Sequence, residues 1–257
     1  MLPLSLKIGS PPIVPVQLGT RTTAPSQQPA AALPVASTGG TCLIAIISNG
    51  ANVSATGPTI ASSGWTTLTT SSELGGAHVE IWAWFNNPGG ILSLSLYAPS
   101  STTWTMQLSE WSGVIGVNSI AVTAIDTVGS ATATSGTTLG LATISNVTVP
   151  GDLAIAAWTQ VIGAGAATTF TSPQGFTRLI DDGATTNTFH VDAEYEINPT
   201  ASLQLAATLT SNKTTSSAAG ALICLFAAPP QIDQTAFIKS GGITLKRTTA
   251  DFALTEP

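Results

Sequence analysis

Two stretches of similar sequence, GGTCLIAIIS (39–48) and PGDLAIAAWT (150–159), decide the fold of this chain. Each is a short, continuous apolar run that follows a glycine, a pattern typical of a β-strand buried on both faces. The glycines Gly40 and Gly151 are 111 residues apart. This spacing indicates an internal repeat, which should then be visible along the rest of the chain.

Further segments keep this spacing to within one residue. The matching pairs are SGWTTL (63–68) with QGFTRL (174–179), HVEIWAWFN (78–86) with HVDAEYEIN (190–198), and LSLSL (92–96) with LQLAA (203–207). Chance rarely produces four blocks at one spacing, so we interpret them as a duplication. Because strands of matching pattern recur in the same order, the two halves are expected to share one topology.

The pattern within the blocks favours strands. Val79, Ile81, Ala83 and Phe85 alternate with other residues and are expected on one face of a strand. Ten or more such short strands, separated by Gly, Pro and Asn turns, predict an all-β antiparallel β-sandwich of two sheets, jelly-roll-like, with an internal pseudo-two-fold repeat. One domain is expected, because half of the strands alone would leave their apolar face uncovered.

Composition limits the partners. Charged residues make up 8% of the chain, the net charge is −6, and only seven residues are Lys or Arg. Binding to nucleic acid or to an anionic membrane surface requires clustered positive charge. We therefore expect neither partner.

The two ends differ from the middle. Residues 1–34 and 230–257 are predicted to be an extended N-terminal arm and a C-terminal arm or tail, flanking a sandwich over 35–229. Pro3 and Lys7 interrupt the first apolar residues, so no secretory signal is expected. The chain is therefore expected to be made in the cytoplasm, although its weakly charged surface resembles that of extracellular proteins. A virion component, which is assembled inside a cell and works outside it, would combine these two features.

Few residues suggest chemistry. His78-Val79-Glu80 and His190-Val191-Asp192 each place an imidazole and a carboxylate on one strand face, as a metal site or a catalytic pair would. The duplication explains the likeness without any site, so we predict no catalytic residue, no metal and no cofactor. Cys42 and Cys224 are interpreted as two buried thiols, with a disulfide as the alternative.

Trp82 and Trp84 share the strand face opposite Val79 and Ile81, so both faces of this strand are apolar. One face must meet a further surface: a neighbouring subunit, another part of the chain, or a glycan. Trp82 and Trp84 are therefore the candidate contact or glycan-binding aromatics.

WTMQLSEWSGV (104–114), VTVPGDLAIAAW (147–158) and SPQGFTRLID (172–181) resemble a duplicated jelly-roll module that recurs in phage virion proteins and bacterial surface proteins. The landmarks of that module are G-D-L, G-W-T and E-Y-S-G-V. Trp111 replaces its Tyr, and Gly40-Thr41-Cys42 departs from its first G-D-L. The resemblance implies decoration, fibre or minor tail proteins and carries no catalytic residues.

Together these features predict a non-enzymatic structural protein of a phage, acting through contacts with other virion proteins and with copies of itself. The alternative is a carbohydrate-binding adhesin that recognises a host surface glycan. A third interpretation, a hydrolase domain, would require His78 or His190 to approach a nucleophile or several carboxylates in a cleft.

Overall fold

A computed structural model describes most of the chain. Every described element is a β-strand, which confirms the all-β prediction, and no helix long and apolar enough to span a membrane occurs among these residues. The chain divides into a sandwich unit, Pro11–Ala228, and a terminal unit formed by Met1–Ser10 and Pro229–Pro257. The described residues are 12–58, 64–98, 101–115, 125–142, 151–162, 168–181, 189–197, 206–215, 217–227, 244–247 and 252–255.

The first half of the sandwich unit, here called repeat 1, contains two sheets. The large sheet has the order β1 (Val14–Leu18), β9 (Thr102–Ser112), β4 (Cys42–Asn49), β7 (His78–Trp84) and β6 (Thr66–Ser72), and β2 (Thr22–Ser26) also pairs with β9. The small sheet has the order β3 (Ala30–Ala32), β8 (Ser93–Tyr97) and β5 (Thr56–Pro58).

Repeat 2 has the same arrangement, which confirms the predicted duplication. Its large sheet has the order β10 (Ile125–Ala133), β17 (Ser217–Leu225), β12 (Leu153–Val161), β15 (Phe189–Ile197) and β14 (Thr177–Asp181). Its small sheet has the order β11 (Gly136–Ala142), β16 (Ala206–Thr215) and β13 (Phe170–Thr171). In the terminal unit, β18 (Thr244–Arg247) pairs with β19 (Phe252–Thr255).

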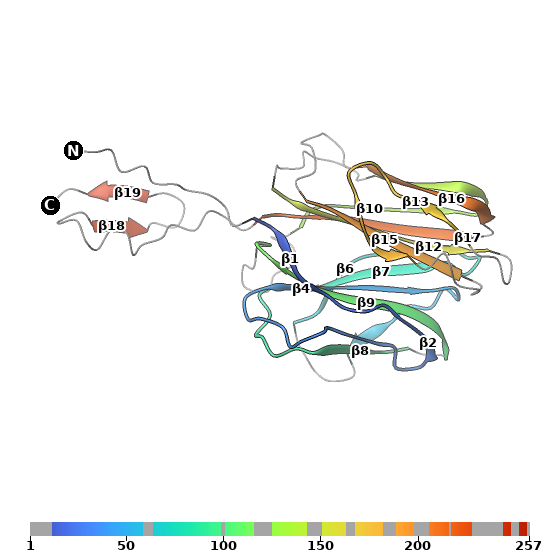
Figure 1. The fold of residues 1–257 in the computed structure, drawn as a ribbon, viewed down its shortest axis with the longest axis horizontal. Helices are drawn as coiled ribbons and strands as arrows, with labels where there is room; N and C mark the ends of the chain where they lie inside the picture. The colour runs from blue at the N-terminus through green and yellow to red at the C-terminus, as the bar shows by residue number, and fades with distance from the viewer. Residues whose placement is uncertain are drawn as a thin grey trace. The chain divides into compact units, whose positions relative to one another are not determined.

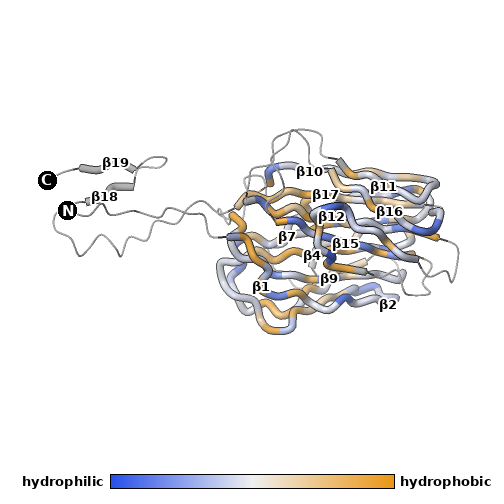
Figure 2. The backbone as a smooth tube through the Cα atoms, turned by 45° about the horizontal axis from the view of Figure 1, so that its top comes forward, coloured by the Kyte–Doolittle hydropathy of each residue, from blue (hydrophilic) through white to orange (hydrophobic). Residues whose placement is uncertain are grey.

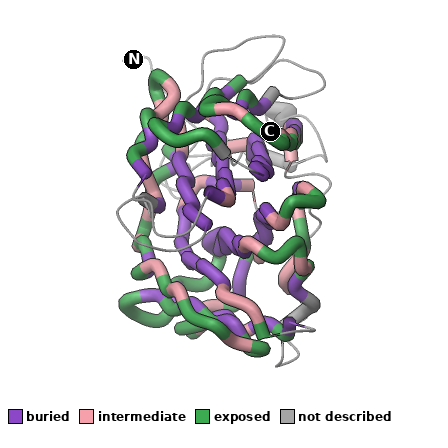
Figure 3. Tube along the Cα trace, turned by 90° about the vertical axis from the view of Figure 1, so that its right-hand side faces the viewer, coloured by how far each residue is buried: buried purple, intermediate pink, exposed green. Residues whose placement is uncertain are grey.

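Three apolar cores separate four layers of sheet in the sandwich unit (Figure 1). The central core joins the two large sheets across the repeats, and each small sheet covers the outer face of its own large sheet. The central strands are therefore buried on both faces, as Cys42–Asn49 is along its whole length. Figure 3 shows buried stretches of chain inside the sandwich unit and exposed stretches around them. A sandwich is confirmed, but it has four layers instead of the expected two, because each repeat does cover its own outer face.

Hydrophobic residues are frequent along the strands of the two large sheets (Figure 2). Val79, Ile81, Ala83 and Phe85 belong to the central core, which confirms the face predicted for them. Trp82 lies on the other face of β7, in the core between the large and small sheets of repeat 1.

The N-terminal boundary of the sandwich lies earlier than residue 35. The sandwich unit begins at Pro11, since β1 and β2 both pair with β9 and β3 pairs with β8. Backbone pairing orders this polar, Pro-containing segment even though it buries few side chains, of which Ile13 is one. At the C-terminal end the unit stops at Ala228, next to the predicted 229.

Candidate functional site

The first histidine–acid pair lies inside the protein. His78 and Glu80 are on the outer face of β7 and both are buried. His78 Nε2 lies 2.6 Å from Glu80 Oε1, and His78 Nδ1 lies 2.6 Å from Ser72 Oγ. Glu80 also accepts hydrogen bonds from the Trp82 indole at 2.6 Å and from the Ala55 backbone N–H at 2.8 Å.

In this arrangement the imidazole of His78 and the carboxylate of Glu80 both form hydrogen bonds within the protein. A neutral imidazole that donates through Nε2 and accepts through Nδ1 satisfies both Glu80 and Ser72. Glu80 in turn holds the indole of Trp82 and the chain just before β5. The pair therefore links β7 to the small sheet, which is a structural role.

The second pair has different neighbours. His190, Asp192 and Glu194 are buried on the outer face of β15, where repeat 1 has His78, Glu80 and Trp82. Arg178 of β14 places its Nε 3.3 Å from Asp192 Oδ1 and 3.6 Å from Glu194 Oε1. Its guanidinium also donates to the Phe170 carbonyl at 2.9 Å. Arg178 thus lies between the two acids and links the edge of the large sheet to β13.

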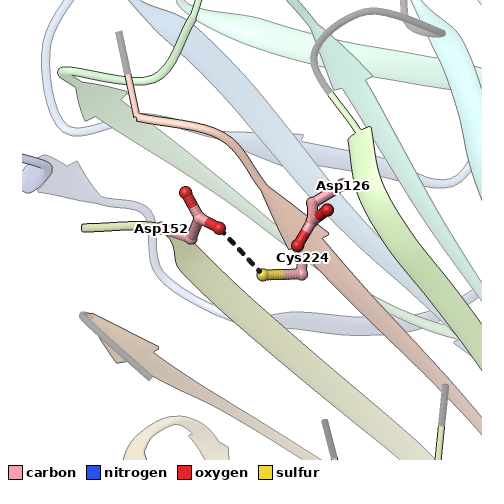
Figure 4. A group of neighbouring side chains, drawn as sticks. All are labelled: Asp126, Asp152 and Cys224. Carbon is pink, nitrogen blue, oxygen red and sulfur yellow. Dashed lines mark hydrogen bonds between the residues drawn. The ribbon is translucent and has the colours of Figure 1, made fainter. Parts of the chain in front are cut away.

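A third group of polar side chains forms where β10, β12 and β17 meet. Asp126, Asp152 and Cys224, here called the Asp–Asp–Cys cluster, offer ligand atoms that all lie within 4.8 Å of one another (Figure 4). The Cys224 thiol lies 3.9 Å from Asp152 Oδ2, and the Ala227 backbone N–H donates to Asp152 Oδ1 at 3.2 Å. These are the residues best placed to hold a divalent cation in the described part of the chain.

The electrostatics of the Asp–Asp–Cys cluster oppose reactivity at sulfur. Burial, followed by the nearby charges of Asp152 and Asp126, raises the pKa of the Cys224 thiol. Burial and the Asp152 carboxylate raise the pKa of Asp126. Because nucleophilic attack and metal ligation both require the thiolate, Cys224 is held in its unreactive form at neutral pH.

The corresponding place in repeat 1 shows what this position does for the fold. Glu110 pairs with Leu43 as Cys224 pairs with Ala154, and the spacing of 111 residues relates Leu43 to Ala154. Glu110 accepts hydrogen bonds from Gln17 Nε2 at 2.5 Å, and from the Thr38 N–H and the Thr41 hydroxyl at 2.8 Å each. A buried polar side chain thus lies at the same end of the large sheet in both repeats, which favours a structural role for the Asp–Asp–Cys cluster.

The predicted contact aromatics are separated by the fold. Trp82 is only 6% exposed and bonded to Glu80, whereas Trp84 is half-buried and packs edge to face with Trp65, with ring centroids 6.0 Å apart. Another part of the same chain, the small sheet, covers the face that holds Trp82. The aromatic pair at the rim of that face is therefore Trp65–Trp84.

Exposed apolar side chains gather instead on the edge strand β1. Val14, Val16 and Leu18 are 43%, 44% and 38% exposed, and Val35 is 63% exposed. The Val35 backbone N–H donates to Gln17 Oε1 at 3.1 Å, which places Val35 beside β1. We call these four residues the β1 patch.

The β1 patch differs from the equivalent strand of repeat 2 at its central residue. Strands β1 and β10 carry a bulge at the same place, between Pro15 and Gln17 and between Ile125 and Thr127. The bulged residue is Val16 in repeat 1 and Asp126 in repeat 2. The fold accepts an acid at this position, so it does not require an apolar side chain there.

Sequence reasoning found both histidine–acid pairs but neither the Asp–Asp–Cys cluster nor the β1 patch. The three cluster residues are distant in sequence, and no local motif joins them. The alternating Val14, Val16 and Leu18 were a usable signal, although the prolines around them favoured an arm. Cys42 and Cys224 are both free and buried, in agreement with the thiol interpretation.

Comparisons with protein-family models, with curated proteins and with solved structures found no match to this chain.

Proposed function

We propose that this chain is a non-enzymatic structural protein of a phage particle, and that it works through contact surfaces. The observation that carries the proposal is the β1 patch, an uncharged apolar surface on a sheet edge, at a position where the other repeat tolerates an acid. Clustered exposed apolar side chains on an otherwise polar protein mark interaction sites.

Two further features support this proposal. Among the described residues, the polar groups best suited to chemistry are buried and connect neighbouring segments of the fold. They are His78 and Glu80 in repeat 1 and Asp152 and Cys224 in repeat 2. The duplicated sandwich and the motif around Trp111 resemble a module of phage virion proteins, as set out above. Capsid decoration, head fibre and minor tail protein are the placements this resemblance implies.

The edge of β1 is suited to side-chain contacts more than to strand addition. Pro15 and Pro25 lie in β1 and β2, and proline on an edge strand removes a backbone donor that an incoming strand would need. We expect the neighbouring virion protein to cover Val14, Val16 and Leu18 with apolar side chains of its own.

The test is Val16→Asp, which copies the residue that repeat 2 has at the same bulge. Purified phage particles produced with the variant should contain at least tenfold less of this protein than wild-type particles, measured by quantitative mass spectrometry. Val128→Asp, at the position of repeat 2 that corresponds to Leu18, is the matched control and should leave incorporation unchanged. Absence of the wild-type protein from purified particles would refute the proposal.

A further inference from the structure

A pocket of about 240 Å³ lies at the edge of repeat 1, where the chain crosses from the large sheet to the small sheet. The crossing segment, which leads from β2 to β3, forms one wall of this pocket. Trp104 and Met106 of β9 form another wall. Their partners in the sheet are Ala24 and Thr22, which also line the pocket, so these four side chains share one face of the large sheet.

The protein alone fixes the shape of the pocket. The Thr22 hydroxyl donates to the Ala30 carbonyl at 2.8 Å, and the Leu96 backbone N–H of β8 donates to the Pro29 carbonyl at 2.9 Å. Pro25 and Pro29 both line the pocket, and their rings restrict the backbone φ angle. A pocket with walls held in this way is suited to a small ligand, because most small-molecule sites are largely pre-formed.

The fold does not require an opening of this size. In repeat 2 the equivalent crossing leads from β10 to β11, and Ala218 of β17 corresponds to Trp104 of β9. Their partners in the central strands, Gln160 and Asn49, are 111 residues apart. The pocket that Gly136 and Ala218 line there has a volume of about 20 Å³, which is room for one water molecule. The larger pocket of repeat 1 is therefore not a consequence of the shared architecture.

The lining of the larger pocket selects against charge. The described residues that line it are all uncharged, and most of them are apolar, as Ala24, Pro25 and Met106 are. An ion would lose its water in such a site without gaining a partner, which is costly. A cavity of about 150 Å³ holds benzene, so this pocket of about 240 Å³ has room for one ring with a small substituent.

Trp104 adds one hydrogen-bond donor to this wall. Its side chain is 1% exposed, and its indole N–H has no hydrogen-bond partner among the described residues. A buried donor without a partner carries a desolvation cost, which an acceptor would remove. A ligand oxygen that reaches the Trp104 Nε1 would supply that acceptor.

We propose that this pocket binds one small uncharged molecule of single-ring size, with an oxygen that accepts a hydrogen bond from the Trp104 indole. The proposal goes beyond the contact surfaces described for the phage protein. It uses none of the residues of the β1 patch, and it applies whether or not the chain is part of a particle.

The probe for this site is benzamide, which has one aromatic ring, no charge and a carbonyl acceptor. Benzoate and benzamidine have nearly the same shape but carry a negative and a positive charge. In ¹H–¹⁵N NMR spectra of the full chain, benzamide should move the indole resonance of Trp104, which is assigned through its loss in Trp104→Phe. Benzamide should bind at least about tenfold more tightly than either ion, because the pocket offers no partner for a charge.

Two substitutions test the position of the site. Ala24→Leu and Ala30→Leu each place a larger side chain in the pocket, and both residues are exposed, so the fold can accept the change. Each should weaken benzamide binding at least about tenfold, because the added side chain takes the space of the ring. Ala32→Leu is the matched control, since Ala32 is an exposed residue of the same strand as Ala30 and does not line the pocket. It should bind benzamide as the wild type does.

An indole resonance of Trp104 that stays in place at about 10 mM benzamide, where even weak binding is visible, would overturn the proposal. Equal binding by Ala24→Leu, Ala30→Leu and Ala32→Leu would also overturn it, as would a preference for benzoate or benzamidine. Val16→Asp should keep the wild-type affinity, which separates this site from the β1 patch. Thermal unfolding, unchanged in the three leucine variants, verifies that the fold is intact.

Discussion

Ser48 and Thr159 occupy equivalent positions in the two repeats, 111 residues apart, and their hydroxyl groups hydrogen-bond to each other. Equivalent residues can touch only where the two repeats meet on their pseudo-two-fold axis, so this contact marks the axis. Both residues are buried. The central core therefore contains a buried polar contact on the pseudo-two-fold axis.

The direction of this hydrogen bond gives the first prediction. The Thr159 hydroxyl donates to the His78 carbonyl at 2.9 Å, and a hydroxyl has one hydrogen, so Ser48 is the donor to Thr159. Thr159→Val leaves both Ser48 and the His78 carbonyl without this partner and should cost about 2 kcal/mol of unfolding free energy. Ser48→Ala removes one hydrogen bond and should cost about 1 kcal/mol.

Denaturant unfolding of the two single variants and the double variant measures the coupling. We expect the double variant to be less destabilised than the two single costs together, because removing both hydroxyls leaves no orphaned donor at Ser48. Strict additivity would show that the two hydroxyls do not interact in solution.

The duplication and the doubly buried strands were predictable from the sequence, since both depend on local pattern. Residues 42–47 are an unbroken apolar run, and their equivalent recurs at a fixed spacing. The layer that covers the outer face was not predictable. Trp82 and Trp84 indicated that this face is covered, but the covering strand β8 has only Leu94 and Leu96 as apolar residues that indicate burial. A short strand with two buried residues gives too weak a pattern to identify a separate layer.

The Asp–Asp–Cys cluster could not be predicted for a different reason. Asp126 reaches Cys224 because a bulge displaces the register of β10 between Ile125 and Thr127, and Asp152 reaches it from the turn before β12. Register and bulge positions depend on pairing partners far away in the sequence. The start of the sandwich before residue 35 could not be predicted for the same reason, because β2 is ordered by its pairing with β9 and not by its own apolar content.

The Glu80 network gives a second prediction. Glu80 Oε1 accepts from His78 and Ala55, and Oε2 accepts from the Trp82 indole. In Glu80→Gln one oxygen becomes an NH₂ group, which then faces a donor and leaves it unsatisfied in a buried site. We expect a loss of about 2–3 kcal/mol in denaturant unfolding.

The matched substitution Glu73→Gln, on a half-buried residue in the turn before the same strand, should change stability by less than about 0.5 kcal/mol. Tryptophan emission should shift in Glu80→Gln alone, because Trp82 loses its acceptor. Equal stability of the two variants would contradict a structural role for the buried carboxylate.

The two thiols give a third prediction. Burial raises the pKa of Cys42, and burial with the charges of Asp152 and Asp126 raises the pKa of Cys224. Neither forms a thiolate near neutral pH, and neither is accessible to a reagent. Ellman's reagent should therefore detect no thiol in the native protein at pH 8 within an hour and two thiols per chain in 6 M guanidinium chloride. Rapid labelling of the native chain would show that one end of the sandwich opens.

Asp126 gives the fourth prediction, in which the pH dependence decides between a structural cluster and a cation site. Burial and the Asp152 carboxylate raise the pKa of folded Asp126 above its unfolded value of 3.8. The folded protein therefore holds this proton more tightly, and the stabilisation is present below about pH 4 and is lost as pH rises through the folded pKa. Asp126→Asn should be more stable than wild type at pH 7, by up to about 1 kcal/mol because Asp126 is partly exposed, and should match it near pH 3. Thermal unfolding with EDTA, with Ca²⁺ and with Zn²⁺ completes the comparison: a wild type that is stabilised by either ion, with Asp126→Asn losing that gain, would make the Asp–Asp–Cys cluster a metal site.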